Sequence, residues 1–399
     1  MTPASTSARL LSPLLGMYFL VLCFHPSALD GVKAAIGAWT IHALWRRDLR
    51  PVIFLDPVCL SVFGFCAVAL CAAILGQGET GAALSILGWL PPLVLGMAFA
   101  RAHPERLGMA MLLGAAILAA YMALVLGLAL AGVSSVAGLL LSPQDLTLTF
   151  RNLTRTALFL ALGALFCVHA LLTVTAPRPR LLAWTALPVL LCSLVLSGKR
   201  MTLAAFMAAS ALLLLWRKKF LAVGLGAVLI PGFILISGLT DRFDPDPKRL
   251  VTSQGVIERQ AVWHAAWELF QNHPLVGVGF KAFKDQAEPL VRAWRESAPQ
   301  HAAPENLEDA HHIVLHILAE SGLLGLACMA VLFGAPLATA WQTRHDEPMA
   351  PGLGAAVVLV LLHLHMHMHL YSTNVHGLVF VLLGMLQGLA PARQDSPCV

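Results

Sequence analysis

The chain has 399 residues, of which 58% are hydrophobic and only 12% are charged. These values exclude a soluble globular domain and predict an all-α integral membrane protein with many spanning helices. The formal net charge of +5 is small for this length, and we expect no nucleic-acid partner. In such a protein the side on which Lys and Arg gather is more informative than their number.

Apolar runs long enough to span a membrane recur about twelve times along the chain, since roughly 20 apolar residues cross a hydrocarbon core. Ser27 and Ala28 follow the first run, as in a cleaved signal peptide. More spans follow at once, so we interpret this run as a retained first helix. The predicted spans are 10–27, 29–45, 57–76, 82–100, 107–132, 152–175, 181–198, 201–216, 220–239, 322–342, 350–370 and 373–391.

Basic residues in the short loops predict the orientation of the chain. Cation-rich loops follow even-numbered spans, so the positive-inside rule makes these loops and both termini cytoplasmic. They are residues 46–50, 101–106, 177–180 and 217–219. The long loop from Thr240 to Ala310 then lies outside, in the periplasm of a Gram-negative cell, and loops of this length are usually functional. The predicted segments are 1–239 with nine spans, 240–321 as the periplasmic segment with the catalytic motifs, and 322–399 with three spans and a short cytoplasmic tail.

Five cations lie at the outer ends of predicted spans, against the positive-inside pattern. They are Lys33, Arg151, Arg155, Lys199 and Arg200. Each could reach lipid headgroup phosphates from its helix end, or it could face a polar cavity and bind a substrate. Arg200 stands between two spans with almost no loop. This position makes contact with headgroup phosphates harder and favours a functional role.

Residues 256–280 of the long loop predict an amphipathic helix followed by a turn rich in Pro and Gly. Arg259, Trp263, Trp267 and Phe270 share one face of this helix. The pattern suits a helix on the membrane surface, or one that holds Arg259 over a site as an anion clamp. Two arginines from different segments could bind a diphosphate, because each guanidinium donates two parallel hydrogen bonds to phosphate. Preplaced cations also stabilise the negative charge that develops as a sugar leaves its diphosphate.

Histidines stand where the long loop meets the tenth span. Capping signals predict a short helix over about 308–320 that ends before Gly322. The helix dipole disfavours a protonated histidine in the first turn, so a neutral imidazole there can act as a base. His312 shares a stripe with His316 and Glu320, whereas His311 lies on a face with two leucines. The spacing alone leaves the choice between His311 and His312 open.

Metal and nucleotide sites have little support in the sequence. His363, His365, His367 and His369 form two pairs at four-residue spacing, but the pairs lie on different faces and no carboxylate accompanies them. Polar contacts between helices are the favoured interpretation. The eight cysteines show no disulfide or metal spacing. The chain lacks a Walker loop, a dinucleotide fingerprint and an HExxH motif, so we expect no cofactor and no metal.

Three motifs together resemble a known family. "ERQAVWHAAWELFQNHPLVGVGFKAF" and, about thirty residues later, "AHHIVLHILAESGLLG" resemble the outer loop of the Wzy/O-antigen ligase superfamily. In that loop R-x3-W, P-L-x-G-x-G and H-N-x2-L-x2-L-x-E-x-G segments recur. "LSGKR" resembles its S-R element. The motifs cover about 195–330, the layout matches over the whole chain, and the O-antigen ligase family is the member group favoured.

The resemblance implies roles for particular residues. The family's histidine falls on His311, and its two pyrophosphate-binding arginines fall on Arg200 and Arg259. Trp263 takes the aromatic position beside the second arginine. The family usually has Asn where this chain has His312, which makes His312 a candidate supporting residue. The remaining outer cations, Arg151, Arg155 and Lys199, are candidates for further phosphate contacts.

The resemblance also implies an activity and a GT-C-like fold. Its members are metal-independent glycosyltransferases whose donor is a polyprenyl-diphosphate-linked glycan, here undecaprenyl-diphosphate-linked O-antigen. Ligases join this glycan to a sugar hydroxyl of the lipid A core at the periplasmic face of the inner membrane. A Wzy-type polymerase and a protein O-oligosaccharyltransferase are alternatives within the superfamily, and ligase ranks first because the chain is compact. A flippase of lipid-linked sugars would distribute polar groups through the membrane, whereas here they gather at one side.

Overall fold

The computed structural model contains only helices, turns and loops in the residues that it describes, which confirms the all-α class. These residues are 11, 13–16, 29–45, 56–130, 153–218, 254–297, 309–365, 370, 371 and 373–391. The α-helices are α2 (Leu29–Trp45), α4 (Pro57–Ile74), α5 (Thr80–Leu84), α6 (Leu90–Ala102), α7 (Leu107–Leu130), α9 (Leu153–Thr173), α10 (Pro177–Leu196), α11 (Arg200–Trp216), α14 (Gln254–Asn272), α15 (Phe283–Ser297), α16 (Ile313–Thr343), α17 (Ala350–Leu364) and α18 (Thr373–Gly388). Two 3-10 helices are η2 (Ser85–Trp89) and η3 (Pro104–Arg106).

Six helical segments in the described part of the chain are long and apolar enough to cross a membrane. They are Pro57–Ile74, Thr80–Ala102, Pro104–Gly127, Thr154–Thr173, Pro177–Leu196 and Ile313–Thr343. Helices α11, α17 and α18 supply shorter apolar segments. The chain is therefore an all-α integral membrane protein. The ninth predicted span and most of the first lie outside the described residues, so the number of twelve stays a prediction.

Two predicted spans differ in detail from the helices. The span 82–100 is built from α5, η2 and α6, because Pro91 and Pro92 stand at the start of α6 and cannot donate to the preceding turn. Helix α10 begins at Pro177, earlier than the predicted 181, since proline is well suited to a first helical position. Arg178 and Arg180 therefore belong to the first turn of this helix.

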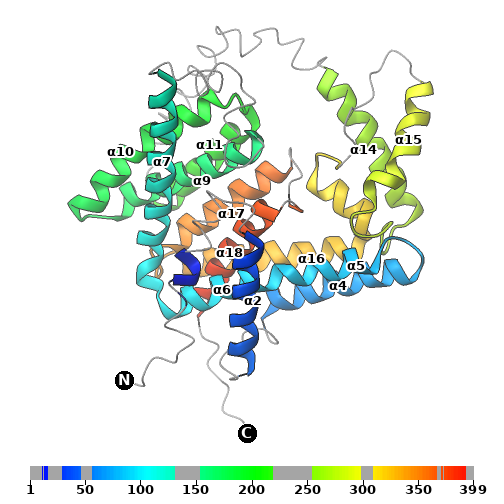
Figure 1. Cartoon of the computed structure of the whole chain (residues 1–399), viewed down its shortest axis with the longest axis horizontal. Helices are drawn as coiled ribbons and strands as arrows, with labels where there is room; N and C mark the ends of the chain where they lie inside the picture. The colour runs from blue at the N-terminus through cyan, green and yellow to red at the C-terminus, as the bar shows by residue number, and fades with distance from the viewer. Residues whose placement is uncertain are drawn as a thin grey trace.

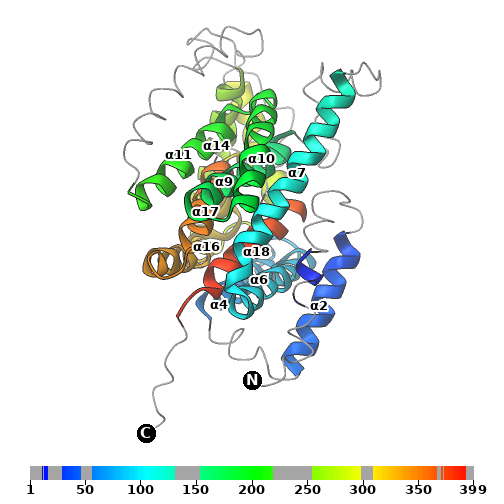
Figure 2. The same ribbon diagram turned by 90° about the vertical axis from the view of Figure 1, so that its left-hand side faces the viewer.

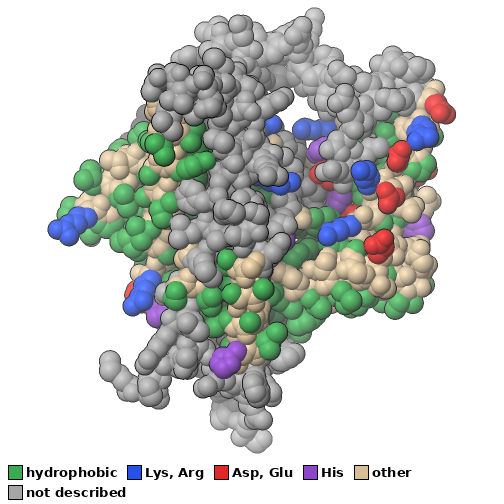
Figure 3. Space-filling model, in the orientation of Figure 1, with side chains coloured by type: hydrophobic (Ala, Val, Ile, Leu, Met, Phe, Trp, Pro, Cys, Tyr) green, Lys and Arg blue, Asp and Glu red, His purple; other side chains and the backbone are tan. Residues whose placement is uncertain are grey.

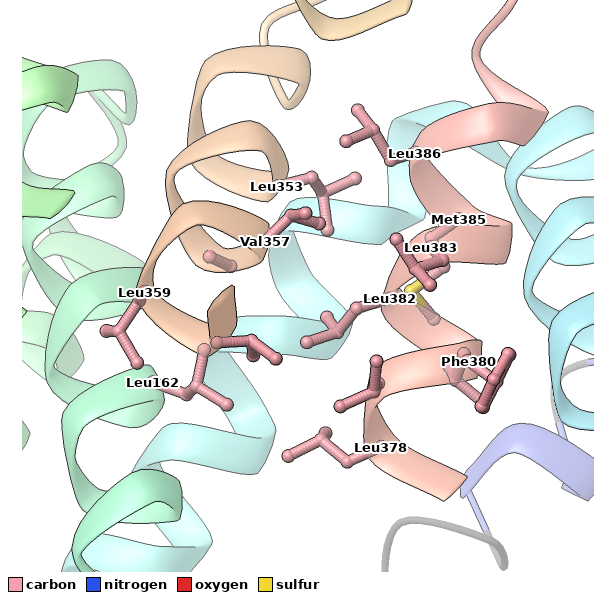
Figure 4. Close-up of a cluster of buried hydrophobic side chains, with 14 of the residues drawn as sticks. Leu162, Leu353, Val357, Leu359, Leu378, Phe380, Leu382, Leu383, Met385 and Leu386 are labelled. Carbon is pink, nitrogen blue, oxygen red and sulfur yellow. The ribbon is translucent and has the colours of Figure 1, made fainter. Parts of the chain in front are cut away.

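The main apolar core joins α9, α17 and α18 with α6, α7 and α16. Figure 4 shows side chains of α9, α17 and α18 in this core, with Leu162 from α9, Leu353 and Val357 from α17 and Leu382 from α18. In both ribbon views α7, α9, α10 and α11 form one group (Figures 1 and 2). Close packing of α6 on α18 requires glycine, because a Cβ at Gly384 would overlap the carbonyl of Leu93.

Helices α14 and α15 form a separate lobe against the beginning of α16 (Figure 1). A second apolar cluster holds the lobe together, and it includes Val262 from α14, Phe283 and Val291 from α15, and Ala319 from α16. The amphipathic helix predicted from residue 256 is α14, which ends at Asn272, and turns occupy residues 273–281. Burial of one face of α14 against another part of the protein thus accounts for its amphipathic pattern.

Candidate active site

A four-residue turn, 309–312, leads into α16. His311 has a left-handed backbone with φ of +48°, a conformation that few non-glycine residues adopt. Asp309 Oδ1 accepts the backbone N–H of His311 at 2.8 Å and lies 2.9 Å from His311 Nδ1. The His311 side chain is 35% exposed, so one edge of the ring remains open to a ligand. The Asp309 carboxylate thus lies within ion-pair distance of Nδ1 of His311, and Nε2 is the ring nitrogen left for chemistry.

The charge of Asp309 suits this contact. Burial alone would raise the pKa of the Asp309 carboxyl. The side-chain contact and the backbone hydrogen bond from His311 outweigh burial, and the pKa of Asp309 falls below its ordinary value. The carboxylate is therefore ionised at neutral pH and can stabilise a proton that His311 takes up.

His312 occupies a different environment from its neighbour. It is the N-cap of α16, where its Nδ1 accepts the backbone N–H of Leu315 at 3.4 Å. Its ring meets Trp263 edge-on and also packs against His365. Burial and the neighbouring His365 lower the pKa of His312, which favours the neutral ring. The predicted helix start at about 308 is wrong, because the capping contact places the first helical residue at Ile313.

Ala310 is held from two sides, and it connects the turn to α14 and α16. The Trp263 indole Nε1–H donates to the Ala310 carbonyl at 2.9 Å. The Ala310 N–H donates to His316 Nδ1 at 3.3 Å. Both peptide groups before His311 are therefore fixed by side chains of other elements.

Glu320 anchors the same region from within the protein. Its Oε1 accepts the backbone N–H of Phe283 at 3.2 Å, and its Oε2 lies 3.5 Å from His316 Nε2. His316 and Glu320 are each only 1% exposed. The Tyr371 ring lies against His316. The pKa of the Tyr371 phenol is raised, mainly by burial and to a smaller extent by the nearby Glu320 carboxylate. The stripe of His312, His316 and Glu320 was visible in the sequence, but the buried pairing of the last two was not.

The P-L-x-G-x-G turn docks on the kink in α16 through backbone hydrogen bonds. Val278 N–H donates to the Ala319 carbonyl and Leu323 N–H donates to the Pro274 carbonyl, each at 2.9 Å. Gly322 interrupts the helical geometry with φ of +61°, which confirms the predicted break at this residue. A Cβ at Gly277 would overlap the backbone of Glu320, and one at Gly322 would overlap that of Leu275. The glycines of both motifs are therefore required by close backbone contact.

The histidine-rich end of α17 links α11 to the turn. Thr202 Oγ1, two residues after Arg200, lies 3.1 Å from His363 Nδ1. His365 packs against His312. The beginning of α11 is thus connected through α17 to the histidine turn, although the Arg200 side chain lies outside the described residues.

Arg259 stands on α14 one turn before Trp263, and its side chain is half-buried. Trp263 contacts the histidine turn, whereas Trp267 is 47% exposed and contacts Phe270. The aromatic residues of the predicted face are therefore partly buried at the turn and partly exposed at the surface. The structure brings Trp263 to the histidine turn and places Arg259 on the same helix.

The remaining candidate cations are less fully described. Lys199, the N-cap residue of α11, is half-buried, and burial lowers the pKa of its amine. Arg155 is half-buried on α9. Arg151 and the Lys33 side chain lie outside the described residues. Basic, acidic and histidine side chains border the hollow between the lobe of α14 and α15 and the other helices (Figure 3).

A metal site has no support in the described part of the chain, where no three His, Cys, Asp or Glu residues are grouped to hold an ion. His363 bonds Thr202, and His365 Nδ1 lies 2.8 Å from the Leu361 carbonyl. His367 and His369 lie outside the described residues. The expected metal independence stays a prediction.

Comparison with known families gives one match that spans these elements. Residues 185–330 match the family model described as O-antigen ligase. No curated protein shows a significant match to the chain. The matched region includes the start of α11, the helix with Arg259 and Trp263, the glycine turn and the histidine turn. Residues 185–330 of the chain are therefore similar to the O-antigen ligase family.

Proposed function

We propose that this protein is an O-antigen ligase that completes lipopolysaccharide. It transfers the glycan from undecaprenyl diphosphate to a sugar hydroxyl of the lipid A core. In this proposal it lies in the bacterial inner membrane with both termini in the cytoplasm and the site facing the periplasm, as the basic loops indicate. The family match supports a glycosyl-transfer enzyme of lipopolysaccharide assembly.

His311 is the proposed general base. Its Nε2 removes the proton from the acceptor hydroxyl while Nδ1 remains beside the Asp309 carboxylate, 2.9 Å away. The hydroxyl oxygen attacks the anomeric carbon, and the bond from that carbon to the diphosphate oxygen breaks. Asp309 stabilises the imidazolium that forms, as the aspartate of a Ser-His-Asp triad stabilises its histidine. A direct displacement of this kind inverts the anomeric configuration.

Arg200 and Arg259 are proposed to bind the diphosphate. Guanidinium groups stay charged at working pH and match the geometry of phosphate oxygens. The negative charge on the leaving diphosphate grows as the sugar bond breaks, so fixed cations stabilise the transition state more than the ground state. Lys199 and Arg155 are candidates for additional phosphate contacts, since both are half-buried cations at the beginning of helices.

The observation that carries this proposal is the held but open His311 ring beside an ionised Asp309, inside the matched domain. The test is reconstitution of the purified protein in liposomes with undecaprenyl-diphosphate-linked O-antigen and lipid A core. A ligase forms a new glycan–core product without added metal. Lengthened glycan on the lipid carrier would indicate a polymerase, and glycosylated protein would indicate an oligosaccharyltransferase. Movement of unchanged donor across the bilayer would indicate a flippase.

The phenotype of a deletion strain provides a second test. Loss of a ligase leaves complete polymer on the lipid carrier, because synthesis continues while attachment stops. Loss of a polymerase instead leaves single repeats attached to lipid A core. Gel analysis of lipopolysaccharide, with extraction of the carrier-linked fraction, separates the two outcomes.

A further inference from the structure

We propose that His316 is a positioning residue, which holds His311 in its active geometry through the peptide of Ala310. The inference rests on the proposed function of His311 as the base. His316 is 1% exposed and therefore cannot meet a substrate itself. It acts on the turn through the hydrogen bond that its Nδ1 accepts from the Ala310 N–H at 3.3 Å.

The contacts of His316 define its tautomer. Because Nδ1 accepts a hydrogen bond, it carries a lone pair, and the proton of a neutral ring must reside on Nε2. Glu320 Oε2 lies 3.5 Å from that Nε2 and favours the proton there. The other carboxylate oxygen of Glu320 accepts the Phe283 N–H, which fixes the carboxylate in turn. Glu320 thus selects the one neutral form of His316 that can accept from Ala310.

The turn needs such a support because of its backbone. His311 lies at φ of +48°, which a residue with a Cβ adopts only when its surroundings enforce it. The Ala310 carbonyl is held by Trp263, and the Ala310 N–H is held by His316. If the second bond is lost, the Asp309–Ala310 peptide is free to rotate, and Asp309 and His311 no longer meet in the same way.

Amide side chains test this role atom by atom. In His316→Asn the amide oxygen takes roughly the place of Nδ1 and can still accept from Ala310. In His316→Gln the amide reaches the place of Nε2 and Glu320, and no acceptor remains near Ala310. We expect His316→Gln and His316→Leu to lower kcat about 10- to 100-fold with little change in KM, since small displacements of a catalytic group have effects of this size. His316→Asn should recover most of the lost kcat.

The matched control is His169→Leu. His169 is also a buried histidine, 2% exposed, but it lies on α9 against Gly352, away from the turn. Removal of this ring should leave kcat near the wild-type value. Chromatographic behaviour and melting temperature in detergent identify any variant that fails to fold, and the comparison of Asn with Gln remains informative when the Leu variant does not fold.

Two results would overturn the inference. One is equal kcat for folded His316→Asn and His316→Gln, and the other is wild-type kcat for folded His316→Gln. A wild-type protein that forms no ligated product would instead reject the proposed function. In that case, the rate at which diethyl pyrocarbonate carbethoxylates His311 still measures the geometry of the turn. We expect this rate to differ from wild type in His316→Gln and to equal wild type in His316→Asn. Equal rates in all three proteins would reject the positioning role.

Discussion

Two adjacent histidines, His311 and His312, lie in different environments because their side chains have different partners. His311 leaves the helix path, keeps one ring edge open and places Nδ1 beside Asp309. His312 uses its Nδ1 to cap α16 and packs between Trp263 and His365. The ring of His311 is therefore available for proton transfer, whereas His312 stabilises the helix start.

This difference predicts unequal effects of mutation. His311→Ala should lower kcat by about 10²- to 10⁴-fold, the usual contribution of a general base. His312→Asn retains an acceptor for the Leu315 N–H and should keep activity within several-fold of wild type. Ligation rates of the two purified variants provide the measurement, and a larger loss in His312→Asn than in His311→Ala would make His312 the base.

The lowered pKa of His312 predicts a pH effect on stability. Its pKa in the folded protein lies below the ordinary 6.5, so the unfolded chain binds the proton more readily. The contribution of the neutral ring to the free energy of unfolding is complete above pH 6.5 and declines as pH falls through the folded pKa. The melting temperature of His312→Asn should therefore depend less on pH between 7 and 5 than that of wild type. Parallel curves would contradict this.

At the scale of elements, the site depends on backbone contact between segments that are distant in sequence. The turn at 274–279 bonds to residues on both sides of the kink in α16, and glycines permit the approach. Helix α14 adds the Trp263 bond to Ala310. The lobe of α14 and α15 is thereby joined to the helix that follows the histidine turn.

Substitution of the glycine at the kink should be far more harmful than substitution of Gly334 in the same helix. Gly322→Ala introduces a Cβ into the Leu275 backbone and a residue with φ of +61°, a conformation that alone costs about 1–3 kcal/mol. Gly334→Ala, in the same helix, has no atom within 4 Å of the new Cβ. We expect a marked drop in melting temperature and activity for the first variant only. Equal melting temperatures would show that the docking contact is dispensable.

The Trp263 bond can be removed while an aromatic ring is kept. Trp263→Phe loses the donor to the Ala310 carbonyl, and a hydrogen bond of this type contributes about 0.5–1.5 kcal/mol. We expect kcat to fall by roughly 10-fold, because the turn loses one of its two peptide anchors. Trp267→Phe is the control, since Trp267 is exposed and contacts Phe270. Similar kinetics for both variants would refute the anchoring role.

For the whole molecule, the proposed orientation makes the outcome of reporter fusions predictable. Alkaline phosphatase is active only after export, so a fusion after Ser297 should be active and a fusion after Pro391 should be inactive. The reason is the excess of Lys and Arg in the loops assigned to the cytoplasm. The reverse pattern would place the histidine turn on the cytoplasmic side and reject a periplasmic ligase.

Much of the architecture could be predicted from residue order alone. Apolar runs of about 20 residues must form helices in a membrane, since no water is present to satisfy free backbone groups, and α4, α7, α9 and α16 follow the predicted runs. The break at Gly322 and the amphipathic α14 were also predicted, because both arise from local signals. The helix start at 308 was wrong, because the capping partner of Leu315 is a histidine, which is not a usual N-cap residue.

The sequence by itself determined the helical membrane class, the motifs and a short set of candidate cations and histidines. Only the tertiary structure decided which partner each histidine has, because those partners come from distant segments: Trp263 reaches Ala310 across 47 positions, and Thr202 reaches His363 across 161. The φ of +48° at His311 and the buried pairing of His316 with Glu320 likewise arise from contacts that no local periodicity encodes.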